Sequence, residues 1–145
     1  MKIFQIVDIL RDYCTENEIV FLYGSQAYRN AIADRTKYNA EQKIMIADFR
    51  ARATYVNTSR SSLVFAGIIG LGQVRETETR ASLDELYLQK YDRRLKELSS
   101  GLEGLLKGIS CNNDLDVTQA EYFLDINKMD INADFVVCNI TLKYE

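Results

Sequence analysis

The sequence contains no histidine, no proline and no tryptophan among its 145 residues. Histidine is the commonest general base near neutral pH and the commonest metal ligand, so its absence argues against most catalytic and metal sites. The three cysteines, Cys14, Cys111 and Cys138, lie far apart and form no CxxC pair. This spacing argues against a zinc site and a disulfide framework, and it predicts buried structural thiols in a reducing compartment.

Long apolar runs are also missing, since none approaches the ~18 residues that a membrane-spanning helix needs. The first residues, MKIFQIVDILRDY, carry Asp8, Arg11 and Asp12 inside their apolar pattern. This pattern predicts an amphipathic helix rather than a signal peptide, and no contact with a membrane. Hydrophobic residues make up 47% and charged residues 27% of the chain, which is typical of a globular protein with a single domain over residues 1–145.

The net charge of −3 is unevenly distributed along the chain. Residues 25–60 carry seven basic and three acidic side chains, a net charge of +4. Residues 111–145 carry seven acidic side chains against Lys128 and Lys143, a net charge of −5. Such a distribution is most often an ordinary solvated surface, and it also fits head-to-tail contact between copies, with the basic region of one against the acidic region of the next.

Hydrophobic periodicity predicts a helix and three strands in the first half of the chain. The predicted elements are a helix over 2–15, a short buried strand over 19–23, a long polar loop over 25–42, an alternating strand over 43–56, a loop over 57–62 and a buried strand over 63–71. In the 43–56 strand, Met45, Ala47 and Phe49 begin one face, and Asp48, Arg50 and Arg52 lie on the other.

A capping box at Ser82–Glu85 begins a second helix, whose leucine-rich stripe recurs every three or four residues. Gly101, Gly104 and Gly108 weaken its last turns, so we expect a break near 99–101 or an end at Gly108. Two strands follow, over 119–126 and 134–144. This order predicts an α+β fold, in which an N-terminal helix and one long amphipathic helix pack on a mostly antiparallel sheet.

A strand that ends in Gly24-Ser25 resembles the start of a nucleotidyltransferase site, in which a Gly-Ser turn holds a triphosphate. That family also has an Asp-x-Asp pair that holds Mg²⁺ about a dozen residues later. Here Arg29 replaces a usual glycine, and Asp34 is followed by Arg35 and Thr36. The metal-binding pair is therefore missing, and Gly24 is better interpreted as a turn residue with positive φ.

Two glycine-rich stretches also invite comparison with nucleotide-binding loops. GIIGLG over 67–72 has the wrong order for a dinucleotide loop and lies inside a predicted strand, and GLEGLLKGIS over 101–110 lacks the P-loop spacing. Aromatic residues near the basic segment could stack on nucleic acid, but the chain as a whole is acidic. We therefore expect no cofactor, no metal, no catalytic residue and no enzymatic activity.

The ordered features together resemble the tail-terminator and head–tail connector (neck ring) proteins of tailed bacteriophages. The resemblance lies in an N-terminal helix, a strand ending in Tyr23-Gly24, a strand pair over 43–56 and 63–74, a capped helix over 82–108, and a final strand with the acidic lead-in 132–136. It spans most of the chain. The sequence departs from the family in having no proline in the long loop.

The resemblance implies a structural virion protein, assembled in the host cytoplasm, that forms a closed ring of about six or twelve copies beside neighbouring connector or tail proteins. Genomic DNA would pass through its lumen without sequence-specific binding, which suits an acidic chain, because only basic linings gain from counter-ion release. The candidate interface residues are Arg29, Arg35, Lys37, Arg50, Arg52, Asp125, Asp130 and Asp134.

Two other functions are compatible with the sequence. One is a small non-catalytic adaptor domain that binds another protein, and the other is a degenerate nucleotidyltransferase-like domain. The native mass of the particle separates them, since a closed ring of many copies favours the structural protein and a monomer or dimer favours the adaptor. Mg²⁺-dependent turnover of a nucleotide would favour the third interpretation.

Overall fold

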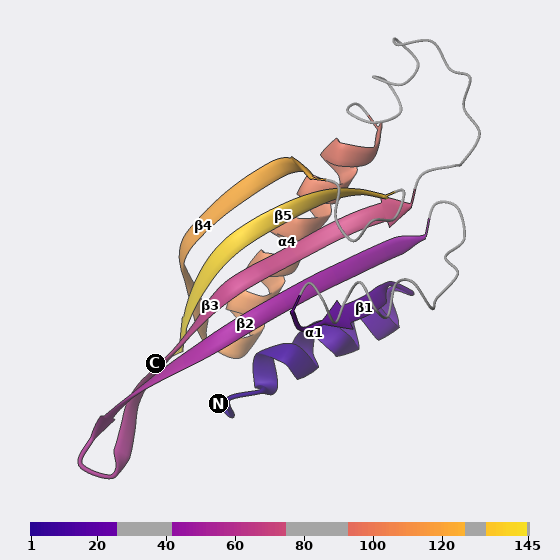
Figure 1. Ribbon diagram of the computed structural model, residues 1–145. Coiled ribbons are helices and arrows are strands. Elements are labelled where there is room, and N and C mark those ends of the chain that lie inside the picture. Colours follow the sequence, from indigo (N-terminus) through magenta and orange to yellow (C-terminus); the bar gives the residue numbers. More distant parts are fainter. Residues whose placement is uncertain (26–41, 75–92, 127–132, 145) are drawn as a thin grey trace, which may run out of the picture.

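A curved five-stranded sheet with two helices against one face forms the described part of the molecule, shown as a computed structural model in Figure 1. The structure describes residues 1–25, 42–74, 93–126 and 133–144. The elements are α1 (Gln5–Glu16), β1 (Val20–Tyr23), β2 (Lys43–Val56), β3 (Ser59–Val74), α4 (Lys96–Asn113), β4 (Leu115–Ile126) and β5 (Ala133–Tyr144). The predicted α+β class is confirmed, with the helices and strands in the expected order.

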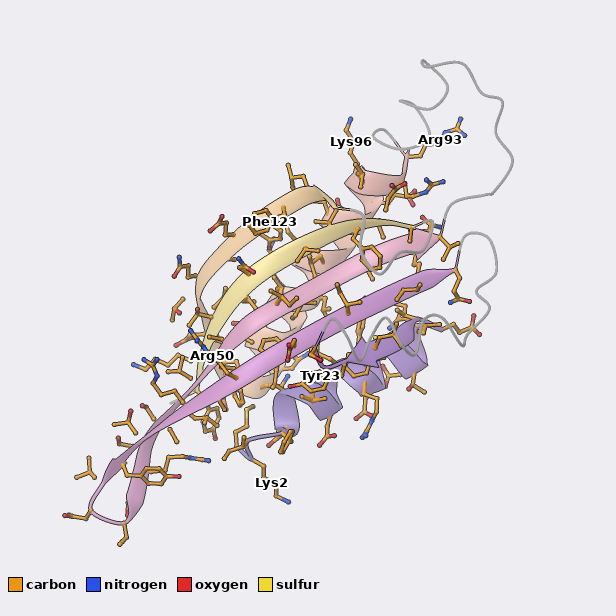
Figure 2. The ribbon with its side chains drawn as sticks, viewed as in Figure 1. Lys2, Tyr23, Arg50, Arg93, Lys96 and Phe123 are labelled. Atoms are coloured by element: carbon orange, nitrogen blue, oxygen red, sulfur yellow. The ribbon has the colours of Figure 1, made fainter. Side chains whose placement is uncertain are left out.

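The strand order across the sheet is β1-β2-β3-β5-β4. Only β1 runs parallel to its neighbour β2, and the other three pairings in the described sheet are antiparallel. β1 is short, and the side chain of its last residue, Tyr23, lies beside β2 in Figure 2. The Tyr23 hydroxyl donates to the Phe49 carbonyl at 3.3 Å and accepts from the Phe49 N–H at 3.4 Å. It therefore supplies hydrogen bonds to the backbone of β2 beyond the end of β1.

The inner half of β2 is buried on both of its faces. Met45 and Ala47 belong to the core that packs against the helices, as the alternation predicted. Ile44 and Ile46 point to the opposite face, where they form a second buried cluster with Phe135 and other apolar residues. The predicted half-buried strand is therefore found only in the outer half of β2, where Arg50 and Arg52 are exposed.

α4 continues past the glycines that were expected to break or end it. It runs unbroken through Gly101, Gly104 and Gly108 to Asn113, and Asp114 follows in a left-handed conformation with φ of 53°. An interior glycine costs only about 1 kcal/mol relative to alanine. Burial of the apolar stripe, Leu98, Leu102, Leu105, Leu106 and Ile109, exceeds that cost because each buried aliphatic side chain contributes about 1.5–3 kcal/mol.

β4 begins four residues earlier than the sequence indicated. Leu115 is fully buried and pairs with Tyr144 of β5, directly after the left-handed turn at Asp114. Two irregularities interrupt the pairing, between Val117 and Gln119 and between Phe123 and Ile126. At the first of them the Thr118 hydroxyl donates to the Thr141 carbonyl at 3.3 Å, so a side chain replaces part of the backbone ladder.

Candidate functional site

The end of the β2–β3 hairpin projects beyond the rest of the sheet, at the lower left of Figure 1. β5 pairs with β3 only from Leu63 onward, so residues 54–62 form a two-stranded ribbon, called the ribbon below. Its turn is Asn57 and Thr58, with Asn57 at φ of 57°, and a register shift between Thr54 and Tyr55 increases its twist. The predicted loop over 57–62 is thus largely strand.

The ribbon is apolar at its tip and carries one charged side chain, Arg60, while Arg50 and Arg52 lie on β2 just before it. Tyr55 is 58% exposed and Val56 is 61% exposed. Residues 49–62 contain three arginines and no aspartate or glutamate. The Arg60 guanidinium, on the strand position opposite Tyr55, donates to the backbone carbonyl of Met1 and so ties the ribbon near its tip to the N-terminus. Because two strands alone are marginally stable in water, such a ribbon is typical of a segment that docks on another surface.

A groove of about 640 Å³ runs between α1 and α4 on the helix side of the sheet, and it is called the helix groove below. Its lining is apolar at the centre, from Ile9, Tyr13, Leu105 and Ile109, with glycines of α4 between them. A Cβ atom added at Gly104 or at Gly108 would meet no described heavy atom within 4 Å apart from the adjoining backbone of α4 itself. The groove is therefore open at those glycines rather than filled by neighbouring side chains.

The rim of the helix groove is acidic. Asp12 and Glu16 of α1 line it, Asn112 and Asn113 lie at its end, and no basic side chain is among the lining residues. Arg11 approaches Asp12 at 3.9 Å, but it also pairs with Asp8 at 3.2 Å and all three side chains are more than half exposed. Exposed pairs of this kind contribute little, so the rim remains attractive to a cation.

A second groove of about 570 Å³, called the sheet groove below, crosses β2, β3, β5 and β4 on the face opposite the helices. Its polar lining mixes both charges and neutral amides, from Asp48, Arg50, Gln119, Glu121 and Asn139. Arg50 is labelled beside the outer half of β2 in Figure 2. Such a mixed lining suits a polar partner and offers no strong field of either sign.

The free edge of the sheet at β4 is the third exposed surface. Phe123 and Leu124 are exposed on it, and Figure 2 shows Phe123 at this edge. Asp116 and Glu121 make it acidic. The two register irregularities leave only a short regular ladder, and bulges together with charges are the features that keep an edge strand from pairing with another chain. The β4 edge is therefore the weaker candidate for a protein contact.

The structure describes only part of the predicted interface. Arg50 and Arg52 lie exposed on β2. Asp134 is buried, 1% exposed, and its carboxylate lies 2.8 Å from the Arg94 guanidinium just before α4, so in this structure it presents no charge to solvent. Asp125 lies in β4. The remaining predicted interface residues lie outside the described ranges: Arg29, Arg35, Lys37 and Asp130.

The cysteines are free thiols, and two of the three are buried as predicted. Cys111 on α4 is exposed instead, because it lies off the apolar stripe of the helix. Burial raises the pKa of the Cys14 thiol to about 12. Burial also raises the pKa of Cys138, although hydrogen bonds from Glu121 and Tyr122 oppose the shift. Both buried thiols are therefore protonated and unreactive near neutral pH.

The turn after β1 has the conformation predicted for Gly24, with φ of 118°. Its N–H donates to the Ala47 carbonyl at 3.0 Å, so this donor serves the sheet and is not directed at a phosphate. Asp34 lies outside the described residues. Within the described ranges, no group of three or more Cys, Asp or Glu side chains is arranged to hold a metal ion. GIIGLG lies inside β3, as predicted, whereas GLEGLLKGIS lies within the continuous helix α4 rather than at a weakened helix end.

No known family model matches the chain, and no curated protein matches its sequence significantly. No helix in the part of the chain that the structure describes is both long and apolar enough to cross a bilayer. Neither the helix groove nor the exposed tip of the ribbon was predicted from the sequence. The glycines in α4, spaced by three and four residues, could have indicated a groove beside the helix. They were interpreted only as residues that destabilise its last turns.

Proposed function

We propose that this chain is a structural, non-enzymatic subunit that assembles into a closed homo-oligomeric ring in the neck or tail of a tailed bacteriophage. The observation that carries the proposal is the ribbon, which projects from the sheet with Tyr55 and Val56 exposed and with only basic charges beside them. A projecting ribbon contacts a neighbour at a different surface from its own, and such heterologous contacts close into rings when the rotation between copies allows it.

The order of the elements supports the phage assignment within this proposal. The described residues contain the N-terminal helix, the strand ending at Tyr23 and the long strand pair on which the resemblance rested. They also contain the amphipathic helix from Lys96 onward, whereas its predicted cap at Ser82–Glu85 lies outside the described ranges. The acidic balance of the chain fits a channel that DNA traverses without being held, because release of counter-ions rewards only basic linings. The neighbours in the particle would be other connector or tail proteins.

Native mass spectrometry and electron microscopy of the purified chain test the ring directly. We expect one closed species of about six or twelve copies, at least when the protein is concentrated or placed on a neighbouring ring. A chain that stays monomeric under all these conditions would contradict the proposal. The assembled ring should not retain double-stranded DNA at physiological salt, and Mg²⁺-dependent turnover of a nucleoside triphosphate would contradict a non-enzymatic role.

A non-catalytic adaptor domain is the second candidate, and the sheet groove favours it. Its lining of mixed charges and amides, including Asp48, Glu121 and Asn139, could take a polar segment of another protein. An adaptor would remain a monomer or dimer, whereas a ring subunit would not. The same mass measurement therefore decides between the two functions.

A further inference from the structure

The ribbon and the helix groove are complementary in shape and in charge. The ribbon offers a protruding apolar tip, Tyr55 and Val56, and the only charged side chains over residues 49–62 are arginines. The helix groove offers an apolar hollow of about 640 Å³ with acidic residues, Asp12 and Glu16, on its rim. We propose that the ribbon of one copy docks in the helix groove of a second copy, and that this contact is the interface of the ring proposed above.

The contact must be made between two molecules. In Figure 1 the tip of the ribbon lies beyond the end of the sheet and well away from α4, which forms one wall of the groove. The ribbon is also held in that direction by its pairing with the long strands and by the contact of Arg60 with Met1. Since the tip and the groove are different surfaces, every copy has one of each, and docking can continue from copy to copy.

The apolar part of the contact supplies most of the affinity, and the charges supply the orientation. A tyrosine in a desolvated pocket is a typical hot spot of a protein interface. The open space beside Gly104 and Gly108 provides room for the aromatic ring of Tyr55, because a Cβ placed there would have no described atom within 4 Å except those of the adjoining helix backbone. Arg52 and the acidic rim steer the approach, so the association should weaken as salt rises to about 1 M and the screening length falls to about 3 Å.

Filling the groove gives the sharpest test. Gly104→Leu with Gly108→Leu should occupy the groove without disturbing the fold, because both side chains begin in open space and leucine favours a helix. We expect this variant to keep or raise its melting temperature and to lose all species larger than a monomer at concentrations where the unmodified chain is assembled. Gly104→Ala, which adds one methyl group to the same helix, is the matched control and should still assemble.

A mixing experiment then identifies the two surfaces. Tyr55→Ser with Val56→Ser removes the apolar tip and leaves the groove intact, so this variant should also be monomeric. When it is mixed with the groove-filled variant, the intact groove of one meets the intact tip of the other. Native mass spectrometry should show a one-to-one heterodimer and nothing larger, because the second site of each partner is blocked.

Each outcome decides a different claim. If the groove-filled chain still forms closed rings, the ring is correct and this interface is wrong. If the unmodified chain forms dimers or open filaments that groove filling abolishes, the interface is correct and the ring is wrong. A mixture that gives no heterodimer, or an unmodified chain that is monomeric at every concentration, overturns the interface.

Discussion

The ring of Phe135 on β5 lies directly over Gly72 on β3. A Cβ atom added at Gly72 would come within 2.4 Å of two carbon atoms of that ring, and the two residues are cross-strand partners. The ring is fully buried and has little freedom to move. The glycine therefore provides the space in which the second buried cluster packs.

This contact predicts opposite effects for the same substitution at two glycines. Gly72→Ala should lower the free energy of unfolding by about 1–3 kcal/mol, the usual cost of overpacking a core. Gly104→Ala should raise it by about 0.5–1 kcal/mol, because its Cβ meets nothing and alanine is the better helix former. Urea denaturation of both variants checks the pair. Equal effects at the two positions would contradict the described packing of Gly72.

A carboxylate placed on the stripe of α4 should prevent folding. Leu98 is 1% exposed, so Leu98→Asp buries a charge without a partner at a cost of several kcal/mol. That cost is comparable to the whole stability of a domain, which is about 5–15 kcal/mol. Circular dichroism should show no cooperative melting, whereas the exposed neighbouring change Ser100→Asp should melt almost as the unmodified chain does. A normal transition for Leu98→Asp would mean that the stripe is not part of the core.

The pattern of apolar residues predicted a helix or strand well where that element has one buried face and one exposed face. The outer half of β2 and the leucine stripe of α4 are of this kind. The end of α4 was missed because glycine propensity is a small term, and the burial of Ile109 beyond Gly108 exceeds it. The buried second face at Ile44 and Ile46 was missed because a two-residue period does not show whether both sides are covered.

The surfaces proposed for assembly could be predicted only in part. Charge counting located the basic region that contains Arg50 and Arg52, since charge is readable directly from sequence. It could not show that Asp134 is buried, because the partner that neutralises it, Arg94, is 40 residues away in the chain. The helix groove combines α1 with α4, and contacts between such distant segments are set by tertiary packing.

The buried pair of Arg94 and Asp134 should be costly to break. Asp134→Asn should lower the free energy of unfolding by about 3–5 kcal/mol, because it removes the carboxylate charge 2.8 Å from a largely buried guanidinium. Replacing both residues, with Arg94→Met and Asp134→Leu, should recover part of that loss. Recovery will be incomplete, since both side chains have further interactions. A double-mutant cycle in urea measures the coupling, and purely additive effects would contradict a direct interaction.

The buried thiol of Cys14 should make stability depend on pH in the alkaline range. Its pKa is raised from 9.0 to about 12 by burial, so between these values the unfolded chain has lost a proton that the folded chain keeps. The contribution of Cys14 is fully present below about pH 8.5 and is lost as pH rises toward 12, with a slope of at most about 1.4 kcal/mol per pH unit.

Cys14→Ala isolates this contribution from the other groups that titrate in the same range. Burial also raises the pKa of Cys138 and of Tyr122, and both remain in the variant. The variant should be less stable near neutral pH, because it leaves a cavity beside Met45, whose sulfur lies 3.5 Å from the thiol. The difference between the two chains should then shrink between about pH 9 and 11, measured by urea denaturation under reducing conditions. A difference that stays constant across this range would show that the Cys14 thiol ionises as readily in the folded chain as in the unfolded one.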